Sequence, residues 1–134
     1  MTTELLLATG TETWDNVGAT LTEGIENLLS EAVSAVVVSM PTTGQRIEAH
    51  RLSNGSLRLA AAGNESLVGG NRLTVRDERA VIAVGFSVAS SSWGTFYWDW
   101  TTPVSAEHVA AGVARTFRDI YKARPNELEL AATF

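Results

Sequence analysis

The sequence contains no cysteine and only two histidines. The absence of cysteine excludes disulfide scaffolds, thiolate nucleophiles and cysteine-based zinc or iron–sulfur sites. Because His50 and His108 do not belong to an HxH or HExxH arrangement, the sequence predicts no metal site. No G-x-S-x-G motif is present, and Gly69-Gly70 has the spacing of neither a phosphate-binding loop nor a dinucleotide fingerprint. The sequence therefore predicts no cofactor and carries no catalytic signature.

Positive charge is also scarce, because 10 Lys and Arg residues face 15 Asp and Glu residues, giving a net charge of −5. Such a chain lacks the general attraction to phosphates on which nucleic-acid binders depend, so we expect no nucleic-acid partner. The cations nearest to a cluster, between residues 115 and 124, are typical of the C-terminal end of a helix, where they complement its dipole.

Long apolar runs are missing as well. No segment approaches the ~20 apolar residues of a membrane-spanning helix. The first residues, MTTELLLATG, have no Lys or Arg before their apolar run and make a poor signal peptide. We therefore expect a protein of the cytoplasm that makes no contact with a membrane.

What the chain does have is the composition of a folded domain. Hydrophobic residues make up 45% of its 134 residues and charged residues 19%, which indicates a packed core. This length fits a single domain over residues 1–134. Residues 1–11 are expected to be a loose arm or an extension of the first helix.

The first half of the chain predicts one helix and three strands. Apolar residues recur at helical spacing over residues 12–31, as in an amphipathic helix. A β-branched run ending at Pro41 then predicts a strand, and QRIEAHRL and SLRLAA, on either side of Asn54-Gly55, predict two more. Short turns between them indicate an antiparallel meander.

The next segment predicts a helix over residues 75–84. Thr74 and Asp77 have the spacing of a capping box, and Gly85 stands where a helix would stop. A strand through AVIAVGFSV is the alternative, because its β-branched residues also support a strand. Residues 89–92 are expected to form a loop.

The aromatic segment GTFYWDWTTP, residues 94–103, alternates between two faces of a strand. Stacking of nucleic-acid bases would need Lys or Arg nearby, and none occurs between Arg79 and Arg115. We therefore expect Phe96, Trp98 and Trp100 to face the helices. The two tryptophans should be only partly buried, because each indole N–H needs a partner.

A helix from Ser105 to about residue 123 and a short terminal strand within NELELAATF complete the expected order, α-β-β-β-α-β-α-β. This order predicts an α+β fold with an antiparallel-dominated sheet and helices packed on one face. The other face would be polar and open, and able to bind a partner. The candidate binding residues on it are Arg46, Glu48, His50, Arg58, Tyr97 and Asp99, with Trp14 or Trp93 as aromatic anchors.

Several motifs occur together in the second half of the chain: Val84-Gly85-Phe86 at the end of a helix, Trp100 to Pro103 as Trp-x-x-Pro, the helix segment from Ala114 to Tyr121, and the closing P-x-E-L. In these motifs the chain resembles the TY-Chap families of actinobacteria, small proteins likened to type III secretion chaperones and to the YbjN family. The resemblance covers residues 20–134. Phe86 stands where the families usually have tryptophan, and the segment from Ser87 to Trp93 lacks the expected proline and acidic residues.

The resemblance implies a chaperone-like α+β fold and a non-enzymatic role. Secretion chaperones of this shape are commonly homodimers that hold an extended client segment, so we expect a peptide or protein client of a secretion or toxin system. The acidic charge suits a client with basic segments. Two alternatives stay open: an immunity or antitoxin-type inhibitor, and a small-molecule enzyme with His50 or Asp99 as general base.

Overall fold

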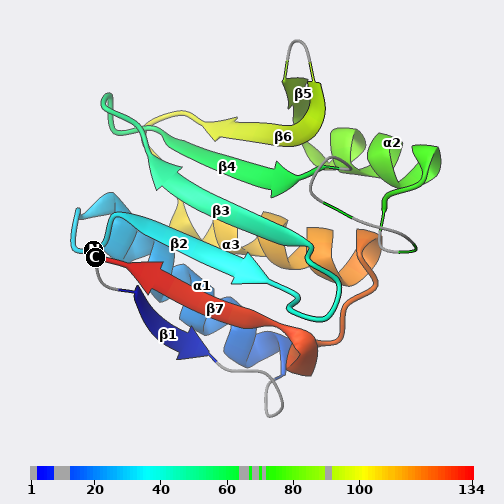
Figure 1. Cartoon of the computed structure of the whole chain (residues 1–134). Coiled ribbons are helices and arrows are strands. Elements are labelled where there is room, and N and C mark those ends of the chain that lie inside the picture. Colours follow the sequence, from blue (N-terminus) through cyan, green and yellow to red (C-terminus); the bar gives the residue numbers. More distant parts are fainter. Residues whose placement is uncertain (1–2, 8–12, 64–66, 68–69, 71, 90–91) are drawn as a thin grey trace.

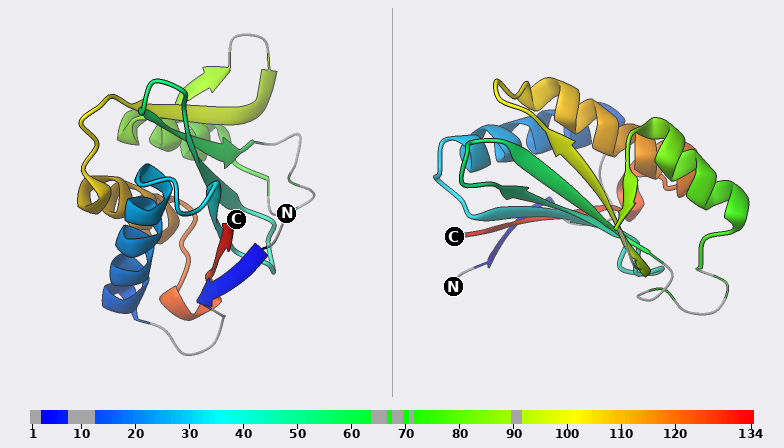
Figure 2. Two further views of the ribbon diagram at one scale, coloured as in Figure 1. Left: turned by 90° about the vertical axis from the view of Figure 1, so that its left-hand side faces the viewer. Right: turned by 90° about the horizontal axis from the view of Figure 1, so that it is seen from above.

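The fold, taken from a computed structural model, is an antiparallel sheet with its helices on one face (Figure 1). The structure describes residues 3–7, 13–63, 67, 70, 72–89 and 92–134. Seen edge-on in the right-hand view of Figure 2, the sheet is a single twisted layer, and α1, α2 and α3 all lie on the same side of it. The predicted α+β class, with helices packed on one face of an antiparallel sheet, is confirmed.

Seven strands form the sheet within the described residues, in the order β1-β7-β2-β3-β4-β6-β5. Each neighbouring pair is antiparallel. The bounds are β1 Thr3–Leu7, β2 Ala35–Ser39, β3 Arg46–Arg51, β4 Leu57–Ala62, β5 Ser87–Ala89, β6 Ser92–Trp100 and β7 Glu129–Thr133. The predicted meander is β2-β3-β4, and its second turn contains Gly55 at a φ of +85°, a conformation that glycine adopts readily.

The helices begin and end where local signals place them. They are α1 (Trp14–Leu29), α2 (Val75–Val84) and α3 (Ala106–Arg115). Helix α3 continues as a π turn, η2 (Thr116–Ile120). A short 3-10 turn, η3 (Pro125–Glu127), follows. The predicted helix over residues 75–84 is confirmed: Thr74 and Asp77 form the reciprocal capping box, and Gly85 ends it. The alternative strand through this segment is wrong, because only its last residues, from Ser87, are extended.

Two strands were not predicted. Thr3–Leu7, expected to be an arm or part of a helix, forms the edge strand β1 beside β7. The loop predicted at residues 89–92 is wrong at both ends, because Ala89 ends β5 and Ser92 begins β6. Both strands are short, and so brief an apolar run does not separate a strand from other structures by its periodicity.

The chain crosses from one side of the sheet to the other through α3. Strand β6 lies near one edge, whereas β7 is inserted between β1 and β2. The antiparallel pairs from β7 through β2, β3 and β4 to β6 make β6 and β7 parallel to one another, and parallel strands need such a long crossover connection. The predicted terminal strand is therefore an interior strand of the sheet.

The core lies between the sheet and the helices. Strand residues that face the helices are almost fully buried, among them Val36, Ile47, Leu59, Phe96 and Leu130. They pack against the apolar stripes of α1 and α3, which also contact each other. Strict alternation in β2, β3 and β4 leaves the intervening side chains on the opposite face, where no described helix covers them.

Candidate binding surface on the open sheet face

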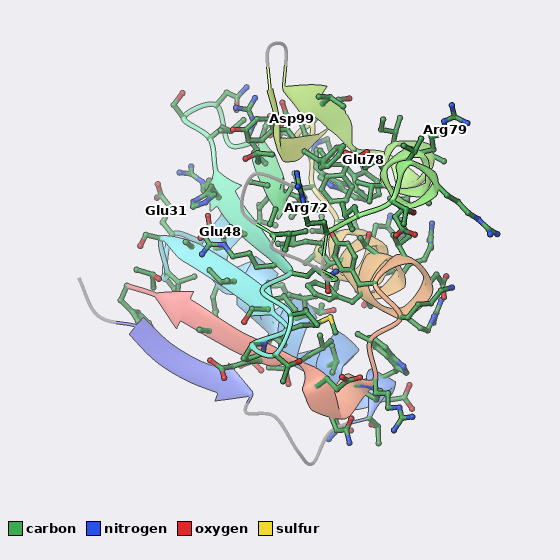
Figure 3. The ribbon with its side chains drawn as sticks, turned by 45° about the vertical axis from the view of Figure 1, so that its right-hand side comes forward. Glu31, Glu48, Arg72, Glu78, Arg79 and Asp99 are labelled. Carbon is green, nitrogen blue, oxygen red and sulfur yellow. The ribbon has the colours of Figure 1, made fainter. Side chains whose placement is uncertain are left out.

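The register of the strands brings six of the predicted binding residues onto the open sheet face. Arg58 on β4 lies opposite His50 of β3 on one side and opposite Asp99 of β6 on the other. In the next row, Ala60 of β4 lies between Glu48 and Tyr97. Arg46, two residues before Glu48, belongs to the same face. Figure 3 shows the positions of Glu48 and Asp99 on the sheet.

Arg58 organises one half of this surface. Its Nε and one terminal nitrogen donate to the two carboxylate oxygens of Asp99 at 2.7 and 2.9 Å, and its guanidinium carbon lies 5.0 Å from the centroid of the Tyr97 ring. The hydrogen bonds from Arg58 lower the pKa of Asp99 and raise that of Arg58. Asp99 is therefore a fixed anion in a bidentate pair, poorly suited to be a general base.

Glu48 organises the other half. It accepts a hydrogen bond from Arg46 with one carboxylate oxygen, and the other lies 3.3 Å from Nε2 of His50. All three groups lie on one strand, two residues apart, so they are neighbours on the same face. The exposed pairs contribute little to folding, and their effect is to hold a fixed pattern of charge on the surface.

A depression of about 330 Å³ lies beside Arg46 and Glu48 on this face. Small side chains form its floor, at Ala60 and Ala62 on β4, while Arg46, Glu48 and Thr95 stand at its rim. The hollow exists because alanines on the middle strand leave the space that larger side chains occupy on the strands to either side. Such a shallow trough along a sheet suits an extended segment better than it suits a compact small molecule.

Of the two predicted tryptophan anchors, Trp14 does not lie on this surface. Trp14 begins α1 and packs, half-buried, against the core on the helical side of the sheet. Trp93 belongs to β6, but its side chain lies outside the described residues. His108, the second histidine, is exposed on α3, on the helical side.

A second hollow, of about 310 Å³, lies on the helical side and was not predicted. Trp98 and Trp100 line it together with Val84 at the end of α2 and with one face of α3, at His108, Ala111, Gly112 and Arg115. The two indole rings are only partly buried, as predicted, and their centroids are 4.7 Å apart. The predicted partial burial of these two tryptophans was the sequence signal for this hollow. Two partly exposed tryptophans on the side of a strand that faces the helices imply that the helices leave a gap there.

The part of the chain that the structure describes holds no group of three or more His, Cys, Asp or Glu side chains able to bind a metal ion. None of its helices has the length and apolar character needed to cross a membrane.

A sheet with one face covered by helices and one open, charged face with a shallow trough is an arrangement that can receive an extended polypeptide segment. Residues 8–133 match the family model TY-Chap3, described as T3SS (YopN, CesT) and YbjN peptide-binding chaperone 3. Because the match spans nearly the whole chain, the protein belongs to this family, and membership implies a peptide-binding chaperone role. No curated protein and no solved structure matches the chain significantly.

Proposed function

We propose that the protein is a non-enzymatic chaperone that holds an extended segment of a client polypeptide on the open face of its sheet. The observation that carries the proposal is the trough over Ala60 and Ala62, which Glu48 and Thr95 line, with Tyr97 paired to Ala60 next to it. Backbone and small side chains of an extended client would fill the trough. Tyr97 offers a large, amphipathic contact of the kind that dominates binding energy at interfaces.

Charge favours a client with basic segments. The whole chain carries a net charge of −5, and Glu48 is the acidic group at the rim of the trough. A Lys or Arg of the client would compete with Arg46 and His50 for the carboxylate of Glu48, since both contacts are partly exposed and cost little to exchange. Electrostatic complementarity of this kind acts mainly on the association rate and on partner choice.

The biological setting belongs to the same proposal. We expect the protein to act in the cytoplasm of an actinobacterium, as a homodimer, on a client of a secretion or toxin system. An immunity or antitoxin-type inhibitor would also act by binding, but on a folded toxin instead of an extended segment. The fixed Arg58–Asp99 pair argues against Asp99 as a general base, and therefore against the version of the enzyme alternative that depends on it.

The test is a native pulldown from the source cells, followed by binding of overlapping peptides from the captured protein. Wild type is compared with Ala60→Arg, which fills the trough, and with Tyr97→Ala. Phe134→Ala is the matched control, because Phe134 is an exposed aromatic residue that does not line the trough. We expect wild type and the control to bind one linear segment, and both open-face variants, Ala60→Arg and Tyr97→Ala, to lose it.

Other outcomes would redirect the proposal. A partner that binds only when folded, and whose toxicity the protein abolishes, would replace the chaperone function with the immunity function. A linear segment bound equally by Ala60→Arg and wild type would keep the chaperone role and remove the open face as its site.

A further inference from the structure

The tryptophan-lined hollow on the helical side has the features of a specific binding groove. Its floor consists of Trp98 and Trp100, whose rings are tilted by 34° to each other, and its α3 wall is low because Ala111 and Gly112 carry little or no side chain. A Cβ atom on Gly112 would lie 3.0 Å from the Trp98 ring, so the glycine lets α3 rest directly on that indole. The groove is thus apolar and preformed, and the packed rings of Trp98 and Trp100 form its base.

The groove lies beside a stretch of sheet edge that has no strand partner. The pairing of β5 with β6 reaches Tyr97, which lies opposite Ser87, the first residue of β5. Strand β6 continues for three more residues to Trp100 and keeps β4 on its other side. Within the described residues no strand pairs with Trp98, Asp99 or Trp100 on the outer side. Such an edge accepts an added strand through main-chain hydrogen bonds.

The charged side chain that lines the groove, Arg115, is a cation, although the protein as a whole carries a net charge of −5. Arg115 stands at the rim of the groove with His108, which lies about two turns before it on α3. Arg115 makes no salt bridge within the described residues. The nearby Asp119 is paired with Arg118 at 2.9 Å, and its pKa is lowered mainly by that pair and to a smaller extent by Arg115.

We propose that this groove is a second client contact, which takes an extended segment carrying a large apolar side chain next to Asp or Glu. The segment would add to the outer edge of β6 beyond Tyr97. Alternate side chains of an added strand point to the same face, so one of them would enter the groove over Trp98 and Trp100. A carboxylate beside it would meet Arg115. This inference rests on the proposed peptide-binding function and adds to it a site and a sequence preference.

The preference differs from that of the open face. The trough there has Glu48 at its rim and suits basic client residues, whereas the groove suits apolar and acidic ones. A client that used both sites would therefore carry two distinct segments, one basic and one apolar and acidic. The two sites lie on opposite faces of the sheet, next to the edge at β6.

The experiment measures binding of two short labelled peptides by fluorescence anisotropy. One peptide has a central Phe flanked by Asp residues, and the other has the same Phe flanked by Lys. The variants are Ala111→Glu, which places a carboxylate in the groove, and Arg115→Gln. Ala19→Glu is the matched control, because Ala19 is an exposed residue of α1 outside the groove. Circular dichroism establishes that each variant is folded.

We expect wild type and Ala19→Glu to bind the Asp-flanked peptide more tightly than the Lys-flanked one. Ala111→Glu should weaken binding of the Asp-flanked peptide by about tenfold or more, and Arg115→Gln by about three- to tenfold, as for a partly exposed charge contact. Binding should also change the fluorescence of Trp98 and Trp100.

Equal affinity of wild type, Ala111→Glu and Arg115→Gln for the Asp-flanked peptide would overturn the groove as a site. The open-face function would survive that result if Ala60→Arg still abolished binding of the client segment found by pulldown. A wild-type protein that bound no peptide in either experiment would overturn both proposals.

Discussion

Replacement of Gly85 by alanine should destabilise the protein strongly, although it adds only one methyl group. Gly85 ends α2 at a φ of +144°, a backbone conformation that residues with a Cβ rarely adopt. A Cβ atom built there would lie 2.4 Å from the ring of Trp98, far inside the normal contact distance. The ring has little room to withdraw, because it also contacts Phe86 and Trp100.

The two effects give the magnitude. Forcing an alanine into a positive-φ conformation costs about 1–2 kcal/mol. Overpacking of a tightly filled site typically costs about 1–3 kcal/mol more. We therefore expect Gly85→Ala to lower the free energy of unfolding by about 3 kcal/mol. In a chain of this length that corresponds to a fall in Tm of roughly 10 °C.

The assay is urea and thermal unfolding, followed by tryptophan fluorescence and circular dichroism. Gly18→Ala is the matched control, because a Cβ atom at Gly18, within α1, meets nothing within 4 Å. That change should raise stability by about 0.5–1 kcal/mol, as a helix gains when glycine becomes alanine. A Gly85→Ala protein as stable as wild type would refute the reasoning. So would a Gly18→Ala protein that lost more stability than Gly85→Ala.

Three further changes test other parts of the structure. Tyr121→Phe should raise the free energy of unfolding by about 1 kcal/mol, because the buried Tyr121 hydroxyl has no hydrogen-bond partner among the described residues. Burial raises the pKa of Tyr121, so wild type should also lose stability relative to this variant as the pH rises above about 10. Thr74→Ala should cost about 1 kcal/mol through loss of the capping box with Asp77, measured by urea unfolding. Asp99→Asn should lower stability slightly at neutral pH but not in acid, because the contribution of the Arg58 pair is lost as the pH falls through the lowered pKa of Asp99; an equal difference at both pH values would contradict that account.

Local patterns determined most of the elements. The capping box at Thr74 and the stop at Gly85 fixed α2 to the residue, because both act within a few positions of the chain. Strict alternation identified β3, β4 and β6, and it separated the helix-facing Phe96 from the outward Tyr97 and Asp99. The six polar residues of the open face could be grouped for the same reason, since side-chain direction in a strand follows from sequence position alone.

The order of strands was not available from such patterns. That β7 pairs with both β1 and β2 depends on contacts between segments about 90 or more residues apart, which no local signal encodes. Trp14 illustrates the same limit. As a tryptophan it was predicted to be an aromatic anchor on the open face. However, α1 packs on the other side of the sheet, so Trp14 lies on that side as well.

The sequence by itself determined the α+β class, the absence of cysteine chemistry, the polar residues that share the open face of β3, β4 and β6, and the family resemblance. Only the tertiary structure decided which residues share a surface. The trough over Ala60 exists because β4 lies between β3 and β6, and the tryptophan groove exists because α2 and α3 approach β6 from different places in the chain. Both sites are gaps between elements. Gaps are set by how distant segments pack, whereas the elements themselves are set by neighbours along the chain.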